Sequence, residues 1–434
     1  AVPALKAASE AGAVQVRRSI QVNLYDNTSG RKLVEHDEPV VIRMNFDASD
    51  FEAAGSDPDR LGIVVVRATA DATPVCPAGA FLMPAKYDGD ARTLTVGTRC
   101  TSAFSVVVLS DGASDVDYAI QGGRFFTQAS GFGGRGGVGY AVIDDGQASF
   151  AAEFARRGGL KGLGYPSSRR FTRDGFPVQV FQKFILQWRA DRNEAVVVNV
   201  FDELHARGYD TYLNDVHGVP PPFDMQADED LSYQEVLRLH VGNILNGRDL
   251  AGTPVPGIDP QAMLSIQKYI FKDDDWLNQY GLPVSVARFP SSIVVRMQRA
   301  AFQYWLDDLP WASAGQITVV LGGDLAKQAG LYRNEDVSPE LPQAYQRVKP
   351  VVGTPVPEMS PTPTPGVKAG AMPTPAGAEV KPAVEEDASG PASFKQGEAK
   401  TGLAPIWNTV VDAVRNMLPD WLLGPRRASS GAAP

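Results

Sequence analysis

The sequence predicts a multidomain chain: an N-terminal all-β sandwich, an α+β region of two repeat copies, a disordered Pro/Thr linker and a C-terminal amphipathic helix. Three observations predict this fold class, namely short period-two apolar runs, a motif that returns later in the chain, and a Pro/Thr-rich stretch. The expected boundaries are 1–115 for the sandwich, 116–147 for a Gly-rich connector, 148–345 for the two-copy repeat domain, 346–403 for the linker, 404–424 for the helix and 425–434 for a tail.

The N-terminal part has the pattern of antiparallel strands. Short apolar runs alternate with turn clusters such as 26–30 and 88–90, which is typical of a β-sandwich. The runs are residues 14–16, 19–24, 40–46, 63–66, 93–96 and 104–109.

Cys76 and Cys100 are the two cysteines of the chain. In an oxidising compartment they would form a disulfide that closes a loop and adds ~3 kcal/mol to stability. The alternative is a pair of buried free thiols.

Residues 92–109, a strand that turns through Thr-Ser-Ala-Phe into a final strand, resemble the end of a ZU5-type or immunoglobulin-like sandwich. The resemblance covers about the last third of the domain. It implies a structural or adhesive role.

The Gly-rich connector contains residues 131–136, which fit the dinucleotide pattern G-x-G-x-x-G. That motif requires a preceding buried strand and a following helix whose N-terminus meets the pyrophosphate. The flanking sequence shows neither, so we interpret the segment as a turn-rich loop.

The middle region repeats a pattern. A short helix over 150–157 ends at Gly158-Gly159, and helical spacing recurs in residues 235–241 and 261–270. Two divergent copies, offset by one residue of slippage, account for the matches. The matched pairs are Gly164 with Gly281, Pro166 with Pro283, Ser168 with Ser285, Phe171 with Phe289, Gln182 with Gln298, Lys183 with Arg299 and Gln187 with Gln303.

The residues Phe154, Gly158-Gly159, 163–166 and Ser168 resemble the LGFP-type repeat of secreted bacterial envelope proteins. The segments 164–188 and 281–305 are also similar to repeats in secreted proteins of green non-sulfur bacteria, some of which accompany cell-wall hydrolases. The resemblance spans about residues 120–335 and implies tethering to the cell envelope. The chain departs from the family because it has two diverged copies and a helical insertion instead of a long tandem array.

Charge excludes some partners. The chain has 41 Lys+Arg and 50 Asp+Glu, a formal net charge of -9, and no basic block. Nucleic acid and anionic lipid surfaces both require clustered cations, so neither is an expected partner. The chain starts with small residues, 1–4, like those left by signal-peptidase cleavage, so we expect an exported protein at the cell surface; a trimmed chain is the alternative.

Carboxylates and imidazoles gather at Asp202, Glu203 and His205, and at Asp215 and His217. They could supply acid/base or metal chemistry, but a solvated helix face is the favoured interpretation. No G-x-S-x-G elbow is present, and we assign no catalytic residue, metal site or cofactor. The acidic runs 228–230 and 273–275 could bind Ca²⁺ weakly, although solvated charge explains them too.

Aromatic, Gln and Arg side chains in the two copies form a candidate glycan site, because sugars stack on rings and accept bidentate hydrogen bonds. The alternative is that these rings fill a core. The candidates are Tyr165, Gln187, Trp188, Arg189, Gln303, Tyr304 and Trp305.

The C-terminal part combines Thr-Pro repeats at 361–365 and 373–375, plausible O-glycan sites, with an apolar helix face. We expect this helix to dock on a protein, with membrane contact as the next alternative. Its predicted contact residues are Ile406, Trp407, Val410, Val414, Met417, Leu418, Trp421 and Leu422.

Together these features predict a non-enzymatic, structural or adhesive protein of the cell envelope. Its expected partners are cell-wall polysaccharide or other envelope proteins, including further copies of itself in an oligomer or larger assembly. Two alternatives remain: a polysaccharide hydrolase that uses Asp202 or Glu203, and a membrane-associated accessory subunit held by the C-terminal helix.

Overall fold

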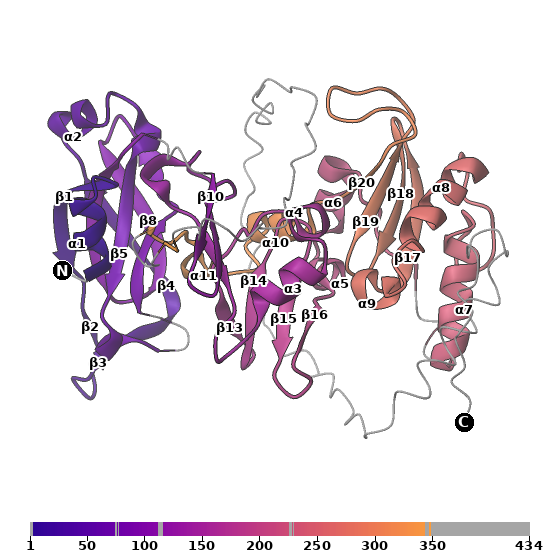
Figure 1. Cartoon of the computed structure of the whole chain (residues 1–434), viewed down its shortest axis with the longest axis horizontal. Coiled ribbons are helices and arrows are strands. Elements are labelled where there is room, and N and C mark those ends of the chain that lie inside the picture. The colour runs from indigo at the N-terminus through magenta and orange to yellow at the C-terminus, as the bar shows by residue number, and fades with distance from the viewer. Residues whose placement is uncertain are drawn as a thin grey trace.

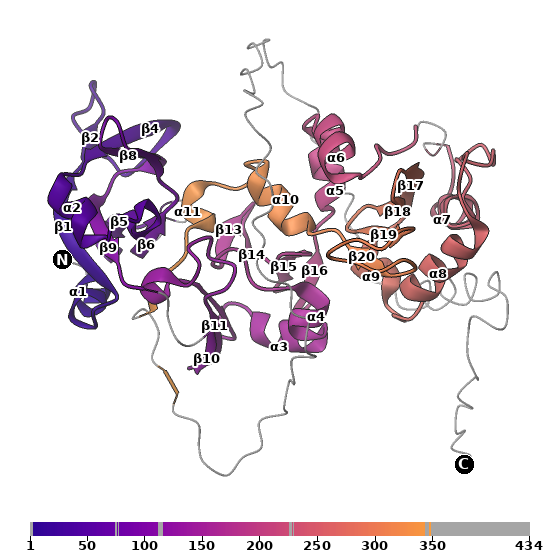
Figure 2. The ribbon, with the colours of Figure 1, turned by 90° about the horizontal axis from the view of Figure 1, so that it is seen from above.

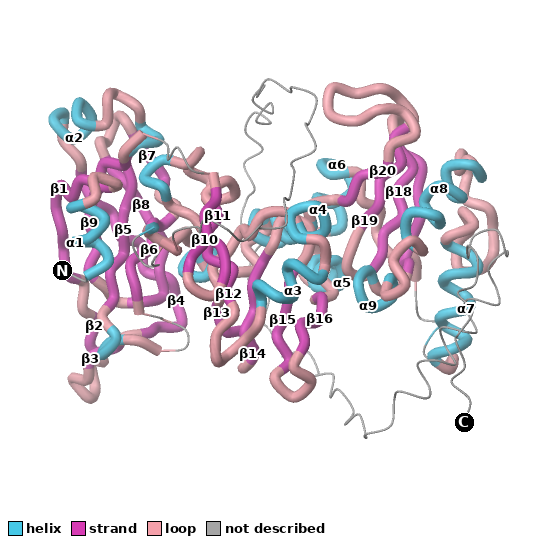
Figure 3. Tube along the Cα trace, viewed as in Figure 1, coloured by secondary structure: helices cyan, strands magenta, loops and turns pink. Residues whose placement is uncertain are grey.

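The computed structural model describes residues 3–73, 76, 78–111, 116–224, 228, 230–342 and 347–348. The described chain is rich in antiparallel sheet with additional helices, as expected, and its parts follow one another along the long axis (Figures 1 and 3). The expectations for the linker, the helix 404–424 with its contact residues, and the tail lie outside the described residues, apart from residues 347–348.

The N-terminal part consists of two sheets packed face to face. One has the order β1-β9-β5-β6 and the other β4-β8-β7, and alternate residues of both fill a shared core. The strands are β1 (Val14–Gln21), β4 (Glu35–Asn45), β5 (Leu61–Arg67), β6 (Gly79–Met83), β7 (Lys86–Asp88), β8 (Thr93–Cys100) and β9 (Ala103–Leu109); the pair β2 (Leu24–Tyr25) and β3 (Lys32–Leu33), the helix α2 (Ala48–Ala53), and the short helices η1 (Pro58–Arg60) and η2 (Thr69–Asp71) complete it.

Strand β5 is buried along its whole length, because its sheet is covered on both faces. The outer face packs against α1 (Pro3–Glu10) and against Val138 and Leu341 from far along the chain. Burial on both faces explains why residues 63–66 are an unbroken apolar run.

The predicted disulfide is confirmed. Cys76 and Cys100, which are 24 positions apart in sequence, are joined with Cα atoms 5.8 Å apart, and both are buried. The bond ties the segment before β6 to the end of β8.

Part of the Gly-rich connector forms a sheet that the sequence did not predict, whereas residues 131–136 form turns, as expected. The sheet has three strands, β10 (Asp117–Ile120), β11 (Gly123–Phe126) and β12 (Tyr140–Ile143). Its glycines allow close strand approach: a Cβ at Gly123 would lie 1.9 Å from the Val142 carbonyl oxygen, and one at Gly139 would lie 2.0 Å from that of Phe126. The G-x-G-x-x-G segment runs into the short turn η3 (Arg135–Gly137) and then a strand, without the helix that a dinucleotide would need.

The middle region contains two four-stranded meanders of the same order. Each is preceded by a short helix and followed by another; the inserted helices α7 (Tyr233–Ile244) and α8 (Pro260–Ile270) pack on the second sheet (Figure 3). The first unit comprises α4 (Gly159–Leu163), β13 (Phe171–Arg173), β14 (Phe176–Val180), β15 (Ile185–Arg189), β16 (Glu194–Val197) and α5 (Val200–Ala206). The second unit comprises α9 (Trp276–Tyr280), β17 (Pro283–Phe289), β18 (Ser292–Met297), β19 (Ala301–Trp305), β20 (Ile317–Val319) and α10 (Gly322–Gln328).

Equivalent positions make equivalent contacts in the two units. The side-chain oxygen of Gln182 accepts from the Tyr165 amide, and that of Gln298 accepts from the Leu282 amide, each at 3.0 Å. One expected match is wrong: Phe171 pairs with Val178, but the corresponding partner of Val294 is Ala287, not Phe289. The register shift between Pro283 and Ser285 in β17 accounts for the displacement.

Each unit is closed by a helix that follows the other unit's sheet. The Phe201 amide at the start of α5 donates to the Gln298 carbonyl at 3.1 Å, and the Gly323 amide of α10 donates to that of Gln182 at 3.0 Å. Figure 2 shows α10 beside β13 and β14 of the first unit. The two units therefore exchange their closing helices.

The chain then returns to the sandwich. The carboxylate of Glu335 in α11 (Asn334–Val337) accepts from the Thr98 hydroxyl at 2.6 Å and the Arg99 amide at 3.1 Å. The last described part of the expected repeat domain thus packs on the N-terminal sheets.

Candidate functional site

The first group of predicted glycan residues lies on or beside β15. Trp188 is 4% exposed and packs edge-on against Phe150 with ring centroids 6.3 Å apart, so its ring has no open face for a sugar. Half-buried Tyr165 packs against Phe126. Arg189 is bonded to Asp191 at 3.1 Å, and Gln187 is half-buried. Trp188 is buried between two half-buried neighbours, Gln187 and Arg189, so it points to the covered face of the strand.

The second group lies on β19 in the other sheet. Gln303 donates to the His217 carbonyl oxygen at 3.1 Å, and the Trp305 indole donates to the Thr318 hydroxyl at 2.9 Å. Tyr304 is half-buried. The two groups lie on different sheets, and within the described chain no hydrogen bond, ion pair or ring contact joins them.

The acidic candidates are each held by a separate partner. Asp202 accepts from Gln298 at 3.1 Å, and Glu203 accepts from Arg173 at 2.9 Å. Burial raises the pKa of Asp202 to about 6, although Arg296 opposes the shift. His205 is bonded to Asp210, while His217 packs edge-on against Tyr212. None of the predicted acid/base residues lines either cavity described below.

The acidic runs do not gather as a metal site would. Asp228 is bonded to His240 at 2.7 Å, and Asp275 accepts from Asn278 at 2.6 Å. Over the described ranges, no group of three His, Cys, Asp or Glu side chains is placed to hold a metal ion.

A cavity of about 210 Å³ lies where the first unit meets the helices before the second. Its wall comes from α3 (Phe150–Arg156), α4, the β14–β15 turn, α8 and α9. The lining side chains are those of Arg156, Arg157, Lys161, Lys183, Phe184, Tyr269, Asp273, Asp275, Gln279, Tyr280 and Val319, with Gly158 and Gly162.

Glycines shape the first-unit wall of this cavity. Gly158 has φ 84°, in the left-handed region, and connects α3 directly to α4. A Cβ at Gly162 would lie 1.7 Å from the Arg157 carbonyl oxygen. This tight turn brings Lys161 and Lys183 together, and the Lys183 ammonium donates to the Lys161 carbonyl oxygen at 2.7 Å.

Positive charge dominates the cavity. Arg156 and Arg157 share the carboxylate of Glu153, at 2.7 Å and 3.2 Å. Neither Lys161 nor Lys183 has a carboxylate within ion-pair distance in the described part of the chain. Burial, and then the charge of Lys161, lower the pKa of Lys183. An anion bound here would offset this repulsion.

The opposite wall is aromatic. Tyr269 and Tyr280 both pack edge-on against Phe302, with centroid distances of 5.6 Å and 5.0 Å, and Tyr269 is 38% exposed. Burial raises the pKa of Tyr280, so its hydroxyl stays protonated. With Gln279 and the two aspartates nearby, this wall offers ring faces next to hydrogen-bonding groups.

The sequence interpretation missed this cavity, apart from noting the acidic run that contains Asp273 and Asp275. The Gly158-Gly159 pair was the available signal, because it belongs to the motif that defines the first copy. The aromatic wall could not be found from sequence, because Tyr269 belongs to the helical insertion and meets Lys183 only in the folded chain.

Comparison with protein-family models, curated proteins and solved structures found no match to this chain. No described helix has both the length and the apolar character that crossing a membrane requires.

Proposed function

We propose that this protein is a non-catalytic, extracellular component of the cell envelope that binds an acidic cell-wall glycan in the 210 Å³ cavity. The observation that carries the proposal is the placement of two lysines that form no ion pair opposite two tyrosine rings in one cavity. Rings accept the apolar faces of sugars, and ammonium groups pair with carboxylate or phosphate substituents.

The size of the cavity and the disulfide are consistent with this role. The cavity is smaller than the roughly 300–1,000 Å³ of sites for drug-sized ligands, which fits one charged sugar unit of a polymer. The Cys76–Cys100 bond is compatible with an oxidising compartment outside the cytoplasm.

The test is co-sedimentation of the full chain with isolated cell walls, followed by titration with soluble polygalacturonate and neutral dextran. We expect retention by walls and binding of polygalacturonate, weakened by salt because the exposed charges are screened. Lys161→Gln and Tyr269→Ala should each reduce binding. The matched controls Lys86→Gln and Tyr25→Ala, which change exposed residues in the sandwich, should not.

Equal binding of dextran and polygalacturonate, or unchanged binding by Lys161→Gln and Tyr269→Ala, would remove the proposed site. Release of soluble sugar from the walls would contradict the non-catalytic assignment. Circular dichroism of every variant distinguishes loss of binding from loss of fold.

A further inference from the structure

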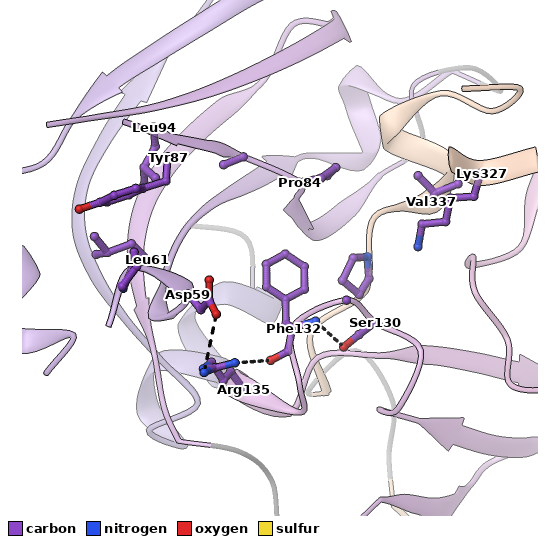
Figure 4. A pocket seen from close by; sticks show the side chains of 14 residues that line it. Asp59, Leu61, Pro84, Tyr87, Leu94, Ser130, Phe132, Arg135, Lys327 and Val337 are labelled. Carbon is purple, nitrogen blue, oxygen red and sulfur yellow. Dashed lines mark hydrogen bonds and ion pairs between the residues drawn. The ribbon is translucent and has the colours of Figure 1, made fainter. Parts of the chain in front are cut away.

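A second cavity, of about 360 Å³, lies where three distant parts of the chain meet. The sandwich contributes residues from 58 to 94, the Gly-rich segment contributes residues 130–135, and the end of the repeat region contributes Lys327, Val337 and Pro339. Figure 4 shows Lys327 and Val337 at one end, Tyr87 and Leu61 at the other, and Phe132 between them.

Apolar side chains line one part of this cavity, beside the polar groups of Asp59, Ser130, Arg135 and Lys327. Leu61, Pro84, Tyr87, Leu94 and Phe132 all line it, and Val337 and Pro339 close the end near Lys327. A molecule bound against this apolar part would bury an apolar body there.

Arg135, one of the two cations that line the cavity, already forms ion pairs. The guanidinium of Arg135 pairs with Asp57 at 3.0 Å and lies 3.9 Å from Asp59. It also donates to the Phe132 carbonyl oxygen at 3.5 Å. With two carboxylates beside one guanidinium, this end of the cavity carries no uncompensated positive charge.

Lys327, the other cation that lines the cavity, donates its hydrogen bonds only to neutral groups. Its ammonium donates to the Tyr140 hydroxyl at 3.2 Å and the Ser167 carbonyl oxygen at 3.1 Å. The Tyr140 hydroxyl in turn donates to the Val337 carbonyl oxygen at 2.6 Å, so it can only accept from Lys327. Among the described carboxylates, none forms an ion pair with Lys327; Asp324 acts on it only at longer range.

This geometry leaves the Lys327 ammonium without a direct counter-ion beside the apolar part of the cavity. A buried charge is costly unless it is paired, and burial lowers the pKa of Lys327 accordingly. One ligand carboxylate would supply the missing partner and use the third ammonium proton.

We infer that this cavity binds a small monocarboxylate with a compact apolar body, its acid group on Lys327 and its body against Phe132, Pro84 and Pro339. The site is separate from the proposed glycan cavity and shares none of its lining residues. Because three parts of the chain form it, an occupant would hold the sandwich and the repeat region together.

The experiment measures thermal unfolding and calorimetric binding of the full chain with benzoate and 4-methylpentanoate, using benzamide as the uncharged match. We expect the carboxylates to raise the melting temperature in proportion to their occupancy, and benzamide to have little effect. Lys327→Met should weaken carboxylate binding about tenfold to a hundredfold, as for a charge-assisted hydrogen bond. Lys86→Met, on the exposed edge of the sandwich, is the control.

A second variant tests the location independently of the charge. Ala85→Leu adds volume inside the cavity and leaves Lys327 in place, so it should also weaken binding. The inference is overturned if neither carboxylate binds at millimolar concentration, if benzamide matches benzoate, or if either Lys327→Met or Ala85→Leu binds as the parent chain does. None of these outcomes depends on glycan binding.

Discussion

Gln298 donates a hydrogen bond to the carboxylate of Asp202 at 3.1 Å, although the two residues belong to different repeat units. The reciprocal bond joins Gln182 of the first unit to Asp324 of the second at 3.3 Å. Each glutamine also accepts from a backbone amide at the start of its own unit. The two glutamines thus connect each unit to the helix that closes it.

The carboxyl of Asp202 makes stability depend on pH. Burial raises its pKa to about 6 from 3.8, so the folded chain binds a proton more tightly than the unfolded chain does. Its contribution to stability is therefore greatest below pH 3.8 and is lost as the pH rises through about 6. Asp202→Asn removes this loss. Relative to the parent chain, its unfolding free energy should increase by about 2–3 kcal/mol as the pH rises from 4 to 7.

Urea denaturation of both chains at several pH values measures this difference. Asp215→Asn, which changes an exposed carboxylate, is the control and should shift stability by a nearly constant amount. If the unfolding free energies of Asp202→Asn and the parent chain differ by the same amount at every pH, Asp202 does not titrate in this range.

Gly164 and Gly281 are required by their backbone. Their φ/ψ values are 78/-175° and 75/-167°, a region essentially restricted to glycine. A Cβ at either position would also lie 2.8 Å from Cβ of the unit's glutamine. Each Gly→Ala change should cost at least about 1–3 kcal/mol of unfolding free energy.

Gly208→Ala separates strain from crowding, because Gly208 has φ 76° but open space around it. We expect it to cost only about 1 kcal/mol. Equal losses in the three variants, measured by denaturant unfolding, would mean that the contact with the glutamine contributes nothing.

Arg296 is fully buried and bridges the exchanged elements. Its guanidinium donates to Asp210 at 2.8 Å, to the Phe201 carbonyl oxygen at 2.7 Å and to that of Pro220 at 3.0 Å. Arg296→Met leaves these buried acceptors without a hydrogen-bond donor, and it should lower the unfolding free energy by about 3 kcal/mol. Exposed Arg288→Met on the same sheet should change it by less than about 0.5 kcal/mol; similar losses in both would refute the bridging role.

The disulfide should stabilise the sandwich. Replacing both Cys76 and Cys100 by Ala should lower the unfolding free energy by about 3 kcal/mol, because the unfolded chain is no longer constrained. The parent chain should become less stable in reductant while the double variant does not respond. If the stability of the parent chain does not change once its disulfide is fully reduced, the disulfide does not stabilise the sandwich.

The sequence allowed prediction of features that follow from local pattern. The disulfide and β-rich content are found, and Gln182 and Gln298 occupy equivalent places. The strands at Gly123 and Gly139 were missed, because glycine favours turns on average but here permits close strand pairing. Of the two roles considered for Trp188, the structure shows the core one; the sequence could not decide, because the direction in which a strand residue points depends on which face is covered.

The candidate sites depend on contacts between distant segments. Lys183 and Tyr269, which belongs to the helical insertion, line one cavity. Lys327 and Phe132 line the other because the chain returns to the sandwich. No spacing in the sequence encodes these approaches, because tertiary packing decides them.

Because the two units exchange α5 and α10, proteolysis of the chain between the units should not separate them. A protease that cleaved the connection between α6 (Asp210–His217) and α7 would leave each fragment holding the helix that closes the other. The halves would stay associated without a covalent link, as in fragment complementation. Separate expression of the two halves would then reconstitute one particle, and a single proteolytic cut in this connection would not dismantle the fold.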